Sequence, residues 1–288
     1  MSRNRDRLGE NQTPHDTSPP VPAQQNDSSS GFSFVVPTEF VDLPSQGKFY
    51  AQGHPLAGET TIEIKQMTAK EEDILTSRTL LKNGVAVDRV IKSLITDKRI
   101  NPDSLLVGDR NAVLIAARIS GYGNTYTTTV GCPACGTTQE YSFDLHDANV
   151  THGGESETGA FDVINNGDGT FNTTLPRTQV NVTFRLLDGV DEKKIFNASE
   201  AARKRNKPEQ TITNQIRTMV VSVNDDNSPQ AINYLIENMP SMDARHLRAC
   251  YREVAPNVDL TQYFSCEECG HSQDMEVPLT ADFFWPNL

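Results

Sequence analysis

The sequence predicts an α+β protein: a helical N-terminal core packed on small β-sheets, and a split zinc-ribbon-like element with an α+β insertion between its two knuckles. Three observations predict this class. Apolar residues recur at helical spacing between residues 69 and 120, period-two alternation marks short strands elsewhere, and two Cys-x-x-Cys-Gly segments lie at 132–136 and 266–270.

The first ordered part of the chain combines two strands with three helices. The apolar residues after Glu39 and the alternating segment Thr60–Lys65 predict strands. Thr68-Ala-Lys-Glu71 is a capping box that opens a helix running to about residue 81, before Asn83-Gly84 stops it. Further helices are expected over 86–97 and 107–120. Each helix is apolar on one side, so we expect them to pack on the early strands and the ribbon.

Each Cys-x-x-Cys-Gly segment has the form of a zinc knuckle between two strands. Two intervening residues let one tight turn direct both thiolates at the same ion, and the glycine accepts the positive φ that the turn needs. A structural Zn²⁺ takes four ligands, so the two knuckles together predict one shared site. The predicted ligands are Cys132, Cys135, Cys266 and Cys269. The predicted flanking strands are 126–130, 137–143, 261–264 and 272–277.

The segment between the knuckles predicts an α+β insertion over residues 146–254, while 37–145 and 255–288 together form the core domain. A hairpin is expected over 161–175, a strand over 180–186, and helices over 191–204, 210–220, 229–238 and 241–253. Arg203-Lys-Arg-Asn-Lys207 is the densest basic run and lies late in a predicted helix. Cations complement the macrodipole there, so a solvated helix end is favoured over a nucleic-acid contact.

The two ends of the chain differ in composition. Residues 1–36 are rich in Asn, Gln, Ser, Pro and Asp, so they are expected to form a disordered arm that buries too little surface to order itself. The other end carries three consecutive aromatic residues, Phe283, Phe284 and Trp285. Such residues are costly to leave in water. They either fold back onto the helical core or make a contact with a neighbouring subunit.

Composition and motifs argue against several classes of function. A net charge of −12 argues against a general nucleic-acid binder, and no apolar run is long enough to span a bilayer, so no membrane partner is expected. Phosphate-loop, dinucleotide, nucleophile-elbow and His-Glu-x-x-His motifs do not occur. Four cysteines close a metal shell, whereas a catalytic zinc keeps one position open. The chain is therefore not expected to be an enzyme.

Two alternatives for the cysteines remain. A thioredoxin-like redox motif would place Cys-x-x-Cys at a helix N-terminus, but a strand is expected after Cys135. A zinc-ribbon nucleic-acid-binding or transcription-related protein would need basic and aromatic residues on the ribbon strands. The strands and knuckles instead carry carboxylates, namely Glu140, Asp144, Glu267, Glu268 and Asp274.

Several segments in a fixed order resemble a known family. They are Leu43-Pro-Ser-x-Gly-x-x-Tyr50, Thr61–Ile64, Met67–Leu75, Leu106–Asn111, Arg118–Gly123, the two Cys-x-x-Cys pairs and the closing Phe283–Pro286. Over 37–150 and 255–288 the chain resembles the baseplate hub and hub-assembly proteins of T4-like contractile-tailed bacteriophages. The resemblance implies a structural or assembly subunit that contacts other hub or tail proteins. It also implies a location in the host cytoplasm during assembly and in the tail baseplate of the virion.

Overall fold

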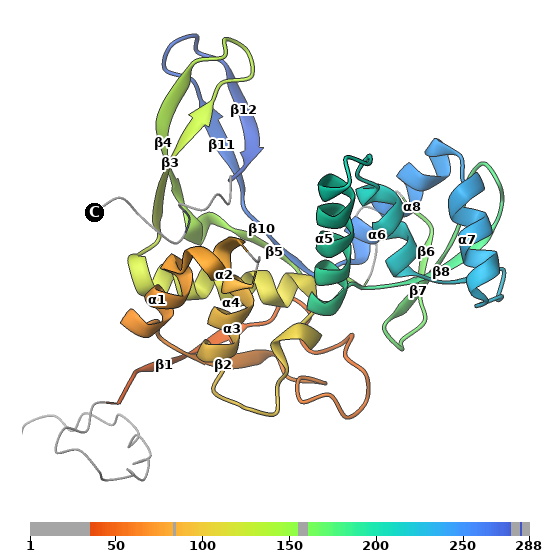
Figure 1. The fold of residues 1–288 in the computed structure, drawn as a ribbon, viewed down its shortest axis with the longest axis horizontal. Helices are drawn as coiled ribbons and strands as arrows, with labels where there is room; N and C mark the ends of the chain where they lie inside the picture. Colours follow the sequence, from red (N-terminus) through yellow and green to blue (C-terminus); the bar gives the residue numbers. More distant parts are fainter. Residues whose placement is uncertain (1–34, 83–84, 155–160, 278–282, 284–288) are drawn as a thin grey trace, which may run out of the picture. The chain divides into compact units, whose positions relative to one another are not determined.

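The computed structural model describes residues 35–82, 85–154, 161–277 and 283. Within these residues the fold is α+β, as predicted, with small antiparallel sheets and eight α-helices (Figure 1). One sheet has four strands and the others have two. No helix in the described part of the chain is both long and apolar enough to cross a lipid bilayer.

The N-terminal core combines one antiparallel strand pair with four helices. In the second strand Ile62 and Ile64 are buried, and they lie on one face because side chains alternate along a strand. In the third helix Val90, Ile91 and Leu94 are buried. The elements are β1 (Thr38–Asp42), β2 (Thr61–Lys65), α1 (Ala69–Thr76), α2 (Arg78–Lys82), α3 (Ala86–Leu94) and α4 (Val107–Tyr122).

Two predicted helix boundaries were wrong. The helix expected to run to residue 81 is broken at Ser77, which has extended backbone angles. The Thr76 hydroxyl donates to the carbonyl of Glu72, a back-bond that competes with regular helix continuation. The next helix ends at Leu94 and not at 97, because Ile95 leaves the helix to bridge Ile64 of β2.

The Leu-Pro-Ser-x-Gly-x-x-Tyr segment fastens the loop between β1 and β2 to the start of α4. The Ser45 amide and hydroxyl both donate to the Asp109 carboxylate, at 2.9 and 2.5 Å. The Tyr50 hydroxyl donates to the same carboxylate at 2.7 Å and accepts from the Leu106 amide. Asp109 is fully buried, and burial raises its pKa. The segment that resembles a family motif therefore holds the fold together at this point.

Two hairpins, called the ribbon hairpins below, carry the cysteine pairs over residues 125–144 and 261–276. The region between them contains the four-stranded sheet, in the order β6-β7-β8-β9. β9 was not predicted: the helix expected over 210–220 ends at Met219, and Val220-Val-Ser-Val223 pairs with β8. β-Branched residues favour the extended form there. The elements are β6 (Val163–Asn165), β7 (Thr170–Thr174), β8 (Asn181–Arg185), α5 (Gly189–Lys204), α6 (Thr211–Met219), β9 (Val220–Val223), α7 (Pro229–Asn238) and α8 (Ser241–Val254).

Buried apolar side chains form two clusters. The first joins β2, α3 and α4 to the bases of the ribbon hairpins, and includes Ile64, Val113 and Phe264. The second lies between the four-stranded sheet and α6–α8, and includes Phe171 and Met219. Tyr50 packs against both clusters, so the loop that carries it connects them.

A two-stranded ladder joins the start and end of the region between the hairpins. β5 (Asn149–Thr151) pairs antiparallel with β10 (Asn257–Asp259), and the Gly154 amide donates to the Val254 carbonyl. β10 packs against α4 at Gly108, where a Cβ atom would lie 2.0 Å from the Pro256 carbonyl oxygen. This ladder was not predicted, because strands of three residues leave almost no periodic signal.

Candidate metal centre

Two β-hairpins carry the four cysteines. β3 (Thr125–Gly131) and β4 (Thr138–Asp144) form the first, and β11 (Thr261–Ser265) and β12 (Ser272–Glu276) form the second. The hairpins run side by side with their turns at the same end (Figure 1). All four strands agree with the predicted flanks to within about two residues, the usual uncertainty of element boundaries.

The two turns have the same backbone hydrogen bonds. The Cys132 amide donates to the Thr137 carbonyl at 2.8 Å, and the Gly136 amide to the Cys132 carbonyl at 2.9 Å. In the second turn Cys266 and Gly270 repeat both bonds at the same distances. The two glycines have φ of 74° and 69°, as the knuckle interpretation requires.

The four sulfur atoms lie together. Cys132 Sγ is 3.7 Å from Cys269 Sγ, Cys135 Sγ is 3.8 Å from Cys266 Sγ, and all four sulfurs are within 4.8 Å of one another. A tetrahedral ion with metal–sulfur bonds of about 2.3 Å requires sulfur–sulfur edges of about 3.8 Å. A disulfide would need roughly 2.05 Å, and the five cysteines are free thiols. The donor set and its spacing therefore fit a closed four-thiolate metal site.

Burial and hydrogen bonding divide the cysteines into two kinds. The first cysteine of each knuckle, Cys132 and Cys266, is buried, and the second, Cys135 and Cys269, is exposed. The hydroxyl and amide of Thr137 donate to the Cys135 sulfur and lower the pKa of its thiol to about 6. The pKa of the Cys269 thiol in the same cluster is raised instead, to about 12, because the lowering by the His271 amide is outweighed by burial and by hydrogen bonds to the other three sulfurs. Since the thiolate is the form that binds a metal, coordination by all four cysteines would release protons.

Side chains that the sequence analysis missed hold the hairpins together. Gln139 Nε2 donates to the Ser265 carbonyl at 3.1 Å, and its Oε1 accepts from the Glu267 amide at 3.0 Å. Gln262 makes a similar pair of bonds to the backbone of Asp144. Both knuckles read Cys-x-x-Cys-Gly-x-x-Gln, with Gln139 and Gln273 at equivalent places, but Gln273 contacts His271, so this pattern does not identify the bonds between the hairpins.

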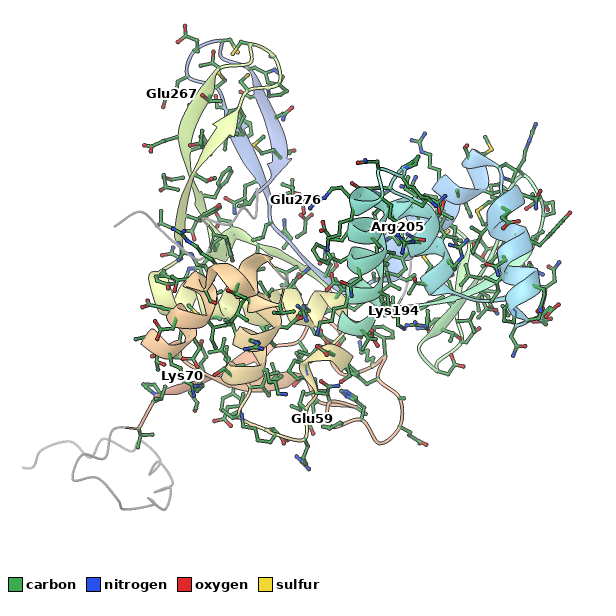
Figure 2. All side chains as sticks on the ribbon, viewed as in Figure 1. Glu59, Lys70, Lys194, Arg205, Glu267 and Glu276 are labelled. Carbon is green, nitrogen blue, oxygen red and sulfur yellow. The ribbon has the colours of Figure 1, made fainter. Side chains whose placement is uncertain are left out.

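The ribbon hairpins are acidic. Residues 125–144 and 261–276 contain no lysine or arginine. Five of their six carboxylate residues are exposed, and Figure 2 marks Glu267 at the turn end of the hairpins and Glu276 at the end of β12. The six are Glu140, Asp144, Glu267, Glu268, Asp274 and Glu276. His271 is not part of the sulfur cluster; its Nε2 lies 3.4 Å from Gln273 Oε1.

The closing aromatic residues are described only in part. Phe283 is 3 % exposed and packs edge-on against Tyr126, with ring centroids 5.3 Å apart. This residue therefore folds back onto its own chain, one of the two expected outcomes. Phe284 and Trp285 lie outside the described residues, so their suggested partner contact stays a prediction.

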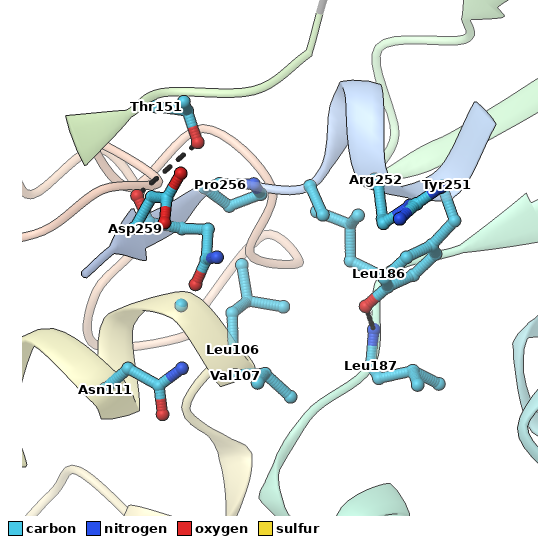
Figure 3. Close-up of a pocket in the computed structure, with 13 residues that line it drawn as sticks. Leu106, Val107, Asn111, Thr151, Leu186, Leu187, Tyr251, Arg252, Pro256 and Asp259 are labelled. Atoms are coloured by element: carbon cyan, nitrogen blue, oxygen red, sulfur yellow. Dashed lines mark hydrogen bonds between the residues drawn. The ribbon is translucent and has the colours of Figure 1, made fainter. Parts of the chain in front are cut away.

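Two other features of the described chain resemble functional sites. Cys250 Sγ lies 3.4 Å from His246 Nε2, but the sulfur is fully buried and burial raises its pKa, which disfavours a nucleophilic thiolate. A cavity of about 430 Å³ lies where α4 meets α8 and β10 (Figure 3). Its wall includes Tyr251, whose hydroxyl accepts from the Leu187 amide at 3.2 Å. It brings together no set of catalytic side chains.

Comparison with known families identifies the chain. The family model described as T4 bacteriophage base plate protein matches residues 36–285, which include both ribbon hairpins and everything between them. Neither the curated proteins nor the solved structures gave a match. The match extends over most of the chain and beyond the 37–150 and 255–288 ranges of the sequence resemblance. The chain therefore belongs to the T4 bacteriophage base plate protein family.

Proposed function

We propose that this baseplate protein is a structural or assembly subunit of the baseplate hub, and that a structural Zn²⁺ ion bound by Cys132, Cys135, Cys266 and Cys269 holds it together. The observation that carries the proposal is the family match over 36–285. A baseplate protein works in contact with other tail proteins and belongs to the tail of the virion. The hub position within the baseplate, and a period in the host cytoplasm before assembly, are the parts we propose.

The arrangement of the cysteines supports a structural role for the metal. Four thiolates complete a tetrahedral shell and leave no coordination position for water or substrate. The metal would join two hairpins whose cysteines are far apart in the sequence, so binding free energy would also be folding free energy. Together with membership of a baseplate family, this favours a non-enzymatic protein.

The charge of the ribbon argues against the alternative of a nucleic-acid-binding zinc ribbon. Phosphate neutralisation needs lysine and arginine, and the two hairpins have neither. Four thiolates around Zn²⁺ would add a further formal charge of about −2. Exposed aromatic side chains alone, such as Tyr263 at 62 % exposure, do not compensate for this repulsion.

We further propose that the chain has the organisation predicted from its sequence. Residues 1–36 would be an arm, 37–145 with 255–288 the core domain, and 146–254 an insertion. The two buried clusters and the β5–β10 ladder support this division.

Locating the protein in assembly intermediates tests the hub role. Tail precursors from cells infected with the phage would be separated into hub, peripheral baseplate and complete tail fractions, and the chain quantified by mass spectrometry. The proposal expects the chain in the hub fraction, with neighbours identified by lysine crosslinking. Presence only in peripheral baseplate pieces would refute the hub position while leaving family membership intact. Retention on an oligonucleotide column at physiological salt would instead favour the nucleic-acid alternative.

A further inference from the structure

A partly apolar groove runs between α5 and α6. It has a volume of about 460 Å³, and its lining includes Ile195 and Phe196 of α5 and Gln215 of α6. Phe196 is 51 % exposed, and Ile212, which follows the lining residue Thr211 on α6, is 50 % exposed. At Val107, Leu187 and Tyr251 the groove adjoins the cavity of Figure 3, because these residues line both. Apolar side chains this exposed beside a groove are typical of a binding surface.

The groove borders the most basic stretch of an acidic molecule. Glu192 is the one charged residue in its lining, and the basic residues follow it along α5, the connecting segment and α6. Residues 193–217 contain seven lysine or arginine residues and two glutamates, in a chain whose net charge is −12. Figure 2 labels Lys194 and Arg205 in the region of α5 and α6. Lys204, Arg205 and Lys207 are exposed, and within the described residues they form no ion pair. Their charge is available to a partner.

The ribbon hairpins carry the opposite charge. They are the acidic surface described above, and no described lysine or arginine pairs with their carboxylates. Tyr263 on β11 is 62 % exposed and offers an apolar ring in the same surface. Acidic groups around an exposed aromatic residue match a basic surface around an apolar groove.

We propose that the α5–α6 groove binds the ribbon hairpins of a second copy of this chain. The two surfaces are different parts of the molecule, so the contact is heterologous: each copy uses its groove for one neighbour and its ribbon for the other. Repeated contacts of this kind close into a ring or continue as a filament. The inference goes beyond the hub role and does not depend on it, because self-association is measured on the isolated protein.

Charge reversal on each surface separately tests the contact. The groove variant carries Lys204→Glu, Arg205→Glu and Lys207→Glu, and the ribbon variant carries Glu267→Lys, Glu268→Lys and Asp274→Lys. The matched control reverses two exposed charges elsewhere, Glu59→Lys and Lys70→Glu (Figure 2). Sedimentation velocity would measure the mass of each zinc-loaded full-length protein at about 50 mM and about 1 M NaCl, where charge contacts are strong and screened respectively. Circular dichroism would confirm that each variant is folded.

The expected result is specific to a heterologous contact. Wild type and control self-associate at low salt and dissociate at high salt. Each variant alone associates at least about 10-fold more weakly, because its groove and ribbon now carry like charges. Mixing the two variants restores assembly, since the ribbon of one matches the groove of the other. The inference is wrong if wild type stays monomeric up to about 200 µM, a concentration that would reveal even weak contacts. It is equally wrong if the groove variant still assembles alone, or if the mixture does not assemble.

Discussion

Arg118 Nε donates a 2.6 Å hydrogen bond to the backbone carbonyl of Phe283, joining α4 to a residue 165 positions later in the chain. The same guanidinium donates to the carbonyls of Gly123 and Thr125 and lies over the Phe283 ring, 5.9 Å from its centroid. Arg118 is fully buried, and its bonds to three carbonyls compensate for lost hydration. The C-terminal end of the described chain is thus part of the core.

Phe283 is therefore expected to contribute to stability before any partner is present. Phe283→Ala removes a buried ring from contact with Tyr126 and Arg118, and should lower the free energy of unfolding by about 3 kcal/mol. Urea unfolding, monitored by circular dichroism, measures this change in the free energy of unfolding. Phe40→Ala is the matched control, since Phe40 is 72 % exposed and its removal should cost under about 0.5 kcal/mol. Equal midpoints for the two variants would contradict the packing described here.

Loss of a cysteine ligand should disorder the ribbon without opening the region between the hairpins. Cys132→Ser leaves three thiolates, and the hairpins should lose much of their mutual contact. The β5–β10 ladder does not depend on the metal, so β6–β9 should stay folded. Hydrogen exchange would show protection lost over 125–144 and 261–276 but kept in β7 and β8. Simultaneous loss in both regions would mean that the metal, and not the ladder, joins the two ends.

Acid should destabilise the core through Glu71. Burial alone would raise the pKa of this side chain, but bonds from Lys65, Ser93 and Thr68 outweigh it and hold the pKa at about 2, against 4.5 for a free glutamate. A carboxylate whose pKa is lower in the folded protein stabilises the fold at pH values above its unfolded-state pKa. That stabilisation is lost as the pH falls towards its folded-state pKa. The unfolding free energy should fall between about pH 5 and pH 2, with at most about 3 kcal/mol from this group. In Glu71→Gln the unfolding free energy should decrease less over the same pH range. The same decrease in wild type and variant would rule out Glu71 as its cause.

Asp109 should also be sensitive to neutral substitution. In Asp109→Asn an amide NH₂ group faces the Ser45 or Tyr50 donors, leaving a buried donor without an acceptor, at a cost of about 2 kcal/mol. Urea midpoints of Asp109→Asn, Tyr50→Phe and the double variant would measure the coupling between the two side chains. We expect non-additive effects, because both variants break the same network. Additive effects would argue that Tyr50 and Asp109 act independently.

The sequence predicted those parts of the fold that have strong local signals. Capping at Thr68, helical periodicity in 107–122 and alternation in 261–265 were sufficient to place α1, α4 and β11. The break at Ser77 follows a local back-bond from Thr76, and the three-residue strands β5 and β10 depend on tertiary contacts; neither leaves a strong trace in a short window. β9 was also missed: it has only four residues, follows α6 directly, and depends on its pairing with β8.

The candidate site was predictable because knuckle spacing is local. Cys-x-x-Cys-Gly specifies a turn, and four such ligands specify a shared ion, so the cluster of Cys132, Cys135, Cys266 and Cys269 followed from residue spacing. The glutamine bonds between the hairpins and the Arg118–Phe283 contact join residues more than a hundred positions apart. No periodicity or spacing in one sequence reports such pairs.

Metal analysis of the purified protein tests the central claim most directly. Protein purified without added metal or chelator would be analysed for all first-row transition metals by mass spectrometry, beside Cys266→Ser and the buried, non-ligating Cys250→Ala. We predict about one zinc per chain for wild type and Cys250→Ala, and a large loss of zinc in Cys266→Ser. Wild-type protein that is folded but contains no stoichiometric zinc, or equal zinc in wild type and Cys266→Ser, would contradict the four-cysteine zinc site.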